Sequence, residues 1–170
     1  VLDGWRVAGL RAAKDRAAWQ KRLEDTPEDV RAEFERTQMG SLPNALHAEV
    51  NKLKRQFSDE KKEVATRKAS ENVLNALADV VPELVGGSAD LTGSNNTRAK
   101  SQKSVTADDF GGSYIHYGIR EHGMAAAMNG IALHKGLIPY GGTFLVFADY
   151  CRPSIRLAAL MQRRAIYVFS

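Results

Sequence analysis

The chain has 170 residues, of which 44% are hydrophobic and 26% are charged, and its formal net charge is +4 at pH 7. This length and composition are typical of a globular domain with a sizeable core and some additional helical structure. No apolar run approaches the roughly 18–20 residues that a membrane-spanning helix needs. The modest positive charge favours small anionic ligands such as sugar phosphates, and we expect neither nucleic acid nor a membrane as a partner.

The single cysteine, Cys151, excludes an internal disulfide framework and indicates a reducing compartment such as the cytoplasm. Residues 1–5 already follow a helical pattern, and residues 165–170 have the pattern of a buried strand. From these two ends we expect the chain to be a fragment of a longer protein.

Residues 1–65 are rich in Ala, Arg, Lys and Glu, which predicts a series of helices. At residues 26–29, Thr26 is the predicted cap and Pro27 the first helical residue, and Gly40 is a predicted end. Another helix is predicted to begin at residues 42–44. The basic residues around it alternate with acids and lack aromatic neighbours, which favours a solvated face over a nucleic-acid surface.

From residue 66 onward, helical patterns alternate with short apolar runs. We predict a helix from residue 66 that ends before Pro82, two later helices at 120–135 and 146–162, and strands at 84–87, 114–118, 137–141 and 165–170. Residues 88–113 are polar and too long for a simple connector, as functional loops often are. The alternation predicts an α/β fold with a doubly wound parallel sheet, preceded by a helical connector.

Glu121 lies in the first turn of a predicted helix, directly after a predicted strand. The plainest explanation is a carboxylate that stabilises the helix dipole by about 0.3–1 kcal/mol. The alternative is a carboxylate that faces a ligand and shares a proton with a basic ring nitrogen. Phe144, Phe147 and Tyr150 follow at spacings of three residues, beyond a strand end, where α/β sheets bind ligands. Core packing is the usual explanation of such aromatic residues, but the strand end, the preceding glycine pair at 141–142 and the polar residues at 149 and 152 weigh against it here.

Two further segments offer candidate ligand contacts. Residues 86–95 combine Gly, Ser and Thr at a strand end, where backbone N–H groups can approach phosphates, and Asp90 is an acceptor among them. Taken alone, the segment is more simply explained as a generic Gly/Ser turn. Arg67 lies at a helix start, where a cation is unfavourable to the dipole, which slightly favours a bound anion; a surface Arg is the plainer explanation. The four histidines show no spacing typical of a metal site, and we expect none in this chain.

Five segments together resemble the transketolase family, and more specifically its pyrimidine-binding domain. In chain order they are Thr-Arg-Lys-Ala-Ser from residue 66, Gly-Gly-Ser-Ala-Asp-Leu-Thr-Gly-Ser-Asn from 86, Tyr-Ile-His-Tyr-Gly-Ile-Arg-Glu-His-Gly-Met from 114, Gly-Gly-Thr-Phe-Leu-Val-Phe from 141 and Arg-Leu-Ala-Ala-Leu-Met from 156. The resemblance covers residues 66–170 closely. Residues 1–65 resemble, more loosely, the helical connector between the family's two cofactor-binding domains.

The resemblance implies transfer of a two-carbon ketol unit from a ketose phosphate to an aldose phosphate, in the pentose phosphate pathway or the Calvin cycle. It implies thiamine diphosphate as cofactor, with Mg²⁺ bound by a preceding domain that this chain lacks. It also implies a homodimer whose active site forms between subunits, so that the fragment alone would be inactive.

The resemblance assigns the catalytic role to Glu121, whose carboxylate hydrogen-bonds the N1′ ring nitrogen of the aminopyrimidine and stabilises its imino tautomer. The same resemblance implies a cofactor pocket in which Phe147 stacks on the aminopyrimidine, Phe144 and Tyr150 complete the wall, and Asp90 lies near the thiazolium ring.

Arg67 and Ser94 resemble the residues that hold the phosphate of the sugar substrate, a task that suits a guanidinium fork. Two alternatives stay open. One is dihydroxyacetone synthase or another thiamine-diphosphate ketol transferase, such as 1-deoxyxylulose-5-phosphate synthase. The other is a non-catalytic relative that uses the domain for dimerisation or ligand sensing, although the intact candidate residues favour an active enzyme.

Overall fold

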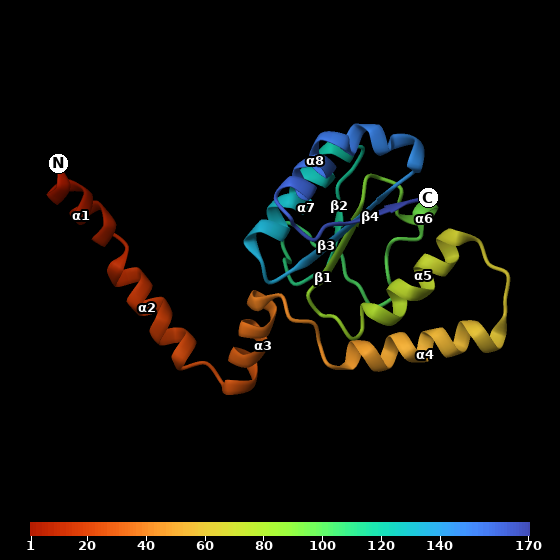
Figure 1. Ribbon diagram of the computed structural model, residues 1–170, viewed down its shortest axis with the longest axis horizontal. Coiled ribbons are helices and arrows are strands. Elements are labelled where there is room, and N and C mark those ends of the chain that lie inside the picture. The colour runs from red at the N-terminus through yellow and green to blue at the C-terminus, as the bar shows by residue number, and fades with distance from the viewer.

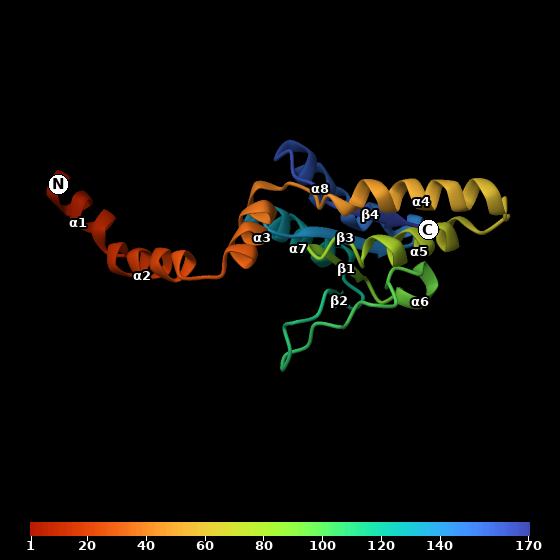
Figure 2. The ribbon, with the colours of Figure 1, turned by 90° about the horizontal axis from the view of Figure 1, so that it is seen from below.

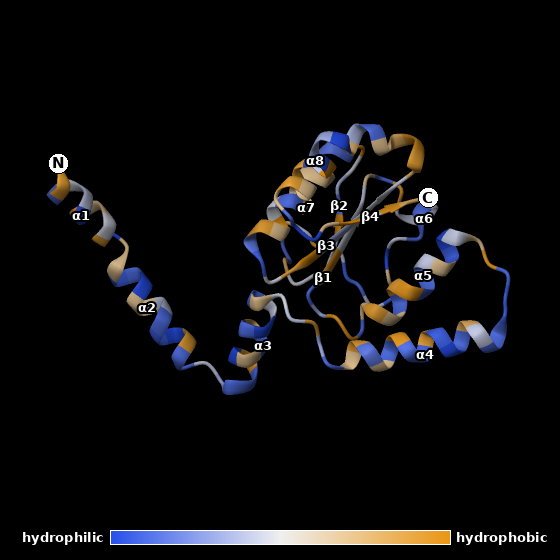
Figure 3. Ribbon diagram, viewed as in Figure 1, coloured by the Kyte–Doolittle hydropathy of each residue, from blue (hydrophilic) through white to orange (hydrophobic).

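The computed structural model describes all residues, 1–170, and begins with a helical arm. Helices α1 (Leu2–Leu10) and α2 (Ala13–Glu24) extend away from the rest of the molecule in both ribbon views (Figures 1 and 2). Neither helix buries a residue, although Figure 3 shows apolar residues on both of them. None of the helices is both long and apolar enough to cross a lipid bilayer.

Two further helices connect the arm to the sheet. Helix α3 (Glu28–Met39) ends at Gly40, which has the left-handed conformation that allows a helix to stop there, as predicted. Helix α4 (Ala45–Glu60) is mostly hydrophilic, with apolar residues recurring along it (Figure 3). The guanidinium of Arg36 in α3 donates to both carboxylate oxygens of Glu83, at 2.8 and 3.0 Å. Because Glu83 is buried directly before the first strand, this ion pair attaches α3 to the sheet.

The sheet has four strands, all parallel, in the order β2-β1-β3-β4. They are β1 (Leu84–Ser88), β2 (Tyr114–His116), β3 (Ile138–Thr143) and β4 (Ile166–Phe169). Helices α5 (Thr66–Leu77) and α4 lie on one face, and α7 (Glu121–His134) and α8 (Ala148–Leu160) lie on the other (Figure 1). The predicted doubly wound parallel α/β sheet with a helical N-terminal segment is therefore confirmed.

Each face of the sheet has its own hydrophobic cluster. Toward α7 and α8, the buried members are Ala89, Met124, Ala125, Met128 and Cys151. Toward α4 and α5, they are Leu74, Val81, Leu84 and Tyr140. Neighbouring residues of a strand point to opposite faces, so Tyr140 belongs to one cluster while Gly141 lies against Met124 and Met128 of the other. Two independent cores thus hold the sheet from both sides.

The ring of Tyr140 crosses the backbone of β1 at Gly86, where a Cβ atom would overlap the ring. The Tyr140 hydroxyl lies 2.7 Å from both the Thr97 carbonyl oxygen and Gln102 Oε1, so the ring is anchored at its far end. Burial raises the pKa of this hydroxyl well above its usual range. A side chain at position 86 would therefore meet an obstacle that has nowhere to move.

Several local details differ from the sequence prediction. The Thr26 hydroxyl donates to the Arg22 carbonyl oxygen at 2.8 Å and so closes α2, while Pro27, predicted as a helical residue, is the cap of α3. The helix expected to reach Pro82 ends at Leu77. Within the predicted loop 88–113, the four residues of α6 (Thr92–Asn95) form a helix that was not predicted.

Replacing Gly86 by Ala is expected to destabilise the protein by about 1–3 kcal/mol, because the new methyl group overpacks against the anchored Tyr140 ring. The matched control is Gly130→Ala on α7, where nothing lies within 4 Å of the added Cβ, and a helical Gly→Ala change is expected to stabilise by about 0.4–1 kcal/mol. Urea unfolding measures both. An unchanged unfolding midpoint for Gly86→Ala would contradict the packing described here.

Candidate active site

A cavity of about 420 Å³ opens at the carboxyl ends of the strands. The chain runs from β1 to its neighbour on one side, β2, and then crosses to its neighbour on the other side, β3. Ligands of open α/β sheets bind in the crevice that such a reversal creates. The residues that line the cavity follow β1, β2 and β3 in turn: Ala89, Asp90 and Leu91; Ile119 and Glu121; Phe147 and Tyr150.

Glu121 is the first residue of α7 and is half-buried at the edge of this cavity. No side chain or backbone N–H donates a hydrogen bond to its carboxylate, and the ion pairs of the chain do not include it. The adjacent Arg120 guanidinium donates instead to the Tyr117 carbonyl oxygen, at 3.0 Å. The carboxylate is therefore free to accept a hydrogen bond from a ligand.

The three predicted aromatic residues form a ladder along the 3₁₀ turn η1 (Leu145–Phe147) and the start of α8. The ring centroids of Phe144 and Phe147 are 6.1 Å apart, as are those of Phe147 and Tyr150, with interplanar angles of 32° and 33°. Phe147 and Tyr150 line the cavity, whereas Phe144 does not and packs against Phe147. The cavity therefore has a broad apolar wall beside its one glutamate.

Asp90 lines the same cavity from the turn after β1. Its φ of 61° lies in the left-handed region, which residues other than glycine seldom adopt. The buried Ser88 hydroxyl stabilises this turn, because it accepts from the Leu91 N–H at 3.1 Å and donates to the Gly142 carbonyl oxygen at 3.0 Å. The turn after β1 is in this way fixed to the end of β3.

Arg67 and Ser94 lie together but outside the cavity. Arg67, in the first turn of α5, donates from Nη1 to the Ser94 carbonyl oxygen of α6 at 2.8 Å. The next residue, Asn95, is fully buried and donates from Nδ2 to Ser170 Oγ at 2.6 Å. Helix α6 is thereby bound to the end of β4, so Arg67 and Ser94 belong to the same edge of the sheet as Glu121.

Sequence reasoning missed four residues of this region. Ala89, Leu91 and Ile119 line the cavity, but each is an ordinary apolar residue. The one sign in the sequence that they belong to the site is that each lies within two residues of a candidate, Asp90 or Glu121. Cys151 is fully buried and donates from Sγ to the Glu121 carbonyl oxygen at 3.4 Å. Burial, with a smaller contribution from the Glu121 carboxylate, raises the pKa of its thiol. Cys151 therefore packs beneath the start of α7.

Residues 62–170 match the family model described as transketolase, pyrimidine binding domain. The chain belongs to the transketolase family. A transketolase of Cereibacter sphaeroides is 55% identical over 170 residues, which are 100% of this chain and 25% of that protein. The chromosomal transketolase of Cupriavidus necator is 48% identical over 174 residues, which cover 100% of this chain and 26% of the relative.

Solved transketolase structures share the fold. The enzyme of Leishmania mexicana superposes with a TM-score of 0.80 at 37% identity, over 94% of this chain and 23% of that one. The Pichia stipitis transketolase in complex with sedoheptulose 7-phosphate gives a TM-score of 0.77 at 36% identity, over 92% and 24%. The chain thus spans about a quarter of the length of the curated relatives it matches. The family resemblance expected from the motifs is confirmed.

Cys151 is expected to react slowly with iodoacetamide in the folded protein at pH 8. Its thiol is buried and its pKa is raised, so the reactive thiolate is both scarce and inaccessible. Peptide mapping by mass spectrometry should show labelling at least about tenfold slower than in urea, because modification requires local opening. Equal rates in both conditions would contradict the burial of Cys151 beneath α7.

Proposed function

We propose that the protein to which this chain belongs transfers a two-carbon ketol unit from a ketose phosphate to an aldose phosphate in carbohydrate metabolism. One observation carries the proposal: an unpartnered carboxylate, Glu121, lies beside an aromatic wall at the switch point of a sheet of the transketolase family. A flat, basic heterocycle needs a pocket with an aromatic stacking surface and a carboxylate that accepts a hydrogen bond, and this cavity offers both.

The residues of this cavity fit thiamine diphosphate. The apolar wall of Phe147 and Tyr150 offers a stacking surface, and Glu121 offers an acceptor that nothing in the chain occupies. When bound, thiamine diphosphate supplies the carbon nucleophile that cleaves the ketose and carries the two-carbon unit. We propose that Mg²⁺ binds with the diphosphate in a preceding domain, as the family resemblance implies.

In this arrangement Glu121 is the catalytic residue. Its carboxylate would accept a hydrogen bond from the N1′ ring nitrogen of the aminopyrimidine and would thereby favour the tautomer that the reaction needs. Phe147 would hold the ring plane by stacking, and Phe144 packs against Phe147. Asp90 also lines the cavity, and the cationic thiazolium ring would gain from its carboxylate.

Arg67 and Ser94 are proposed to hold the substrate phosphate. Arg67 uses one of its N–H groups to bind the Ser94 carbonyl oxygen, which fixes the guanidinium and leaves its other donors unused. The Pichia stipitis transketolases, 35–36% identical to this chain, have been solved with sedoheptulose 7-phosphate and fructose 6-phosphate. These complexes support a sugar phosphate as a ligand of the protein to which this chain belongs.

A homodimer is proposed because large apolar side chains surround the cavity without cover. Ile119 is 79% exposed, Val146 75% and Leu145 66%. Exposed apolar residues that gather at one site are typical of protein interfaces, and a second copy of the protein would both bury them and close the cavity. We propose a cytoplasmic location on the ground of the one free thiol, and no nucleic acid as partner.

The division of the chain is also a proposal. Residues 1–65 would form the helical connector, and residues 66–170 would form the pyrimidine-binding domain. The family model, which begins at residue 62, supports a boundary in the short stretch between α4 and α5.

Glu121→Gln in the full-length protein is expected to lower kcat for ketol transfer from xylulose 5-phosphate to ribose 5-phosphate by about 10²–10⁴-fold. The amide keeps the size of the side chain but cannot hold the proton, so cofactor affinity should change little. The control is Glu28→Gln, which removes a carboxylate from the first turn of another helix, α3. Full activity of Glu121→Gln would refute the proposed role.

Arg67→Gln is expected to raise the KM for the sugar phosphates by roughly 10–100-fold, since charge-assisted hydrogen bonds contribute about 1.5–3 kcal/mol. The KM for a donor without phosphate, such as hydroxypyruvate, should not change. Steady-state kinetics with both donors checks this. An equal rise of KM for hydroxypyruvate would mean that Arg67 acts on the fold of the site and not on the phosphate.

A further inference from the structure

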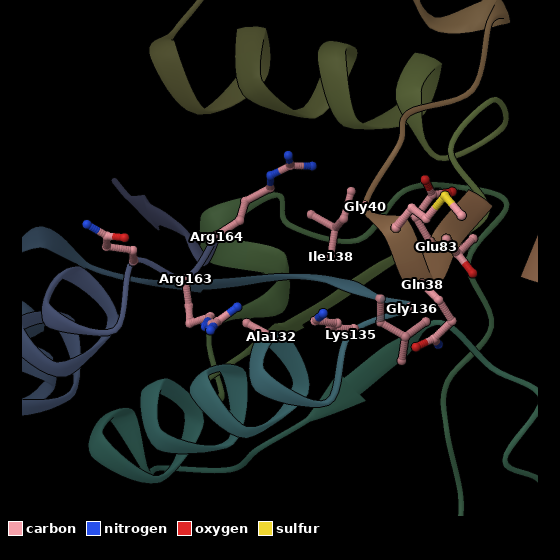
Figure 4. Close-up of a pocket in the computed structure, with 13 residues that line it drawn as sticks. Gln38, Gly40, Glu83, Ala132, Lys135, Gly136, Ile138, Arg163 and Arg164 are labelled. Carbon is pink, nitrogen blue, oxygen red and sulfur yellow. The ribbon is translucent and has the colours of Figure 1, made fainter. Parts of the chain in front are cut away.

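A second cavity, of about 320 Å³, lies at the opposite edge of the sheet, where β1 and β3 begin (Figure 4). The carboxyl ends of three helices converge on it: α3 ends at Met39, α7 at His134 and α8 at Leu160. It shares no residue with the Glu121 cavity. Since α7 has 14 residues and rises about 1.5 Å per residue, roughly 20 Å separates the two sites.

The side-chain charge that lines this cavity is mainly positive, and the partial negative charge of the three helix ends offsets only part of it. Lys135, Arg163 and Arg164 line it, and none of the three takes part in an ion pair or donates a side-chain hydrogen bond. The one carboxylate in the lining is Glu83, and Arg36 already binds both of its oxygens. Small-molecule sites usually contain a few convergent polar groups of this kind.

The end of α8 is satisfied without these cations, because the backbone N–H groups of Met161, Gln162 and Arg163 bind the carbonyl oxygens of Leu157, Ala159 and Ala158. The side chain of Arg163 is therefore not needed at that helix end and stays available to an external anion.

The turns after α7 and α8 each contain a residue with a positive φ. Lys135 has a φ of 69° and Gln162 a φ of 53°, left-handed conformations that cost a residue other than glycine about 1 kcal/mol or more. In Figure 4 the side chains of Lys135 and Arg163 both lie next to Ala132, whereas Arg164 extends away from them. Gln38 of α3 lies against Gly136, and its amide forms no hydrogen bond.

We propose that this cavity binds a small phosphate-bearing anion between Lys135 and Arg163, with the Gln38 amide as a further donor. An ammonium and a guanidinium fork together match a phosphate dianion in charge and geometry. The volume fits inorganic phosphate or a small phosphorylated metabolite. The ligand binds at the far end of α7 from Glu121, so it does not compete with the substrate of the proposed reaction.

The test is isothermal titration of the full-length protein carrying Arg67→Gln, which removes the proposed substrate-phosphate contact. Inorganic phosphate and ribose 5-phosphate are titrated separately at low ionic strength. Saturable binding is expected, and Lys135→Gln with Arg163→Gln should weaken it by at least about tenfold, the effect of losing about 1.4 kcal/mol. The matched control, Lys14→Gln with Arg16→Gln, removes the same charge from exposed positions of α2 and should leave the affinity unchanged.

The two titrants distinguish the sources of the phosphate. Equal affinity for both indicates free phosphate, and preference for ribose 5-phosphate indicates a phosphorylated metabolite. The single variant Arg163→Lys keeps the charge without the guanidinium fork and should weaken binding less than Arg163→Gln does, which separates a charge effect from a folding defect. No saturable binding, or unchanged affinity in the Lys135/Arg163 variant, would overturn the proposal. Ketol transfer by that variant with Arg67 intact tests the proposed function separately and is expected to be unaffected.

Discussion

The two central strands of the sheet, β1 and β3, lack side chains where they approach their neighbours most closely. At Gly86 the ring of Tyr140 takes the place that a Cβ would occupy, and at Gly141 the thioethers of Met124 and Met128 do so. The contact at Gly141 sets the distance between α7 and the sheet, whereas the contact at Gly86 lies on the opposite face. Because Glu121 is the first residue of α7, the Gly141 contact also sets where its carboxylate lies relative to the strand ends. The position of the catalytic candidate thus depends on residues that contribute no functional group.

Most of the fold could be predicted because the apolar runs of this chain are short and separated by clear helical patterns. Turns and short helices were harder to predict from the sequence. Helix α6 has only four residues, too few for a periodic pattern to emerge from the polar segment around it. Thr26 has the sequence signature of a cap for the next helix, yet its hydroxyl binds the carbonyl oxygen of Arg22 behind it. From the sequence alone, one cannot tell whether such a hydroxyl binds a carbonyl oxygen of the preceding helix or caps a backbone N–H of the following one.

The candidate site could be assembled in outline because its residues follow successive parallel strands, whose carboxyl ends meet at one edge. Glu121, Phe147, Tyr150 and Asp90 accordingly line one cavity. The cavity at the opposite edge gave no sequence signal. The carboxyl ends of three helices form it, and the left-handed turn at Lys135 occurs at a residue type for which that conformation is not expected. The order of residues along the chain predicts a site whose residues follow successive parallel strands, but it does not predict a site formed by the ends of helices.

The helical arm has a consequence for how the chain exchanges its amide hydrogens. Helices α1 and α2 have 9 and 12 residues and bury none of them. The aromatic contact of α2 is between Trp19 and Phe34 of α3, whose ring centroids lie 6.4 Å apart in an edge-to-face arrangement. Isolated helices of fewer than about 12–15 residues are marginal in water. Their amides should therefore exchange nearly as fast as those of an unfolded chain, while α7 and the central strands exchange only on cooperative opening. Slow exchange in the arm would reveal that another surface covers it.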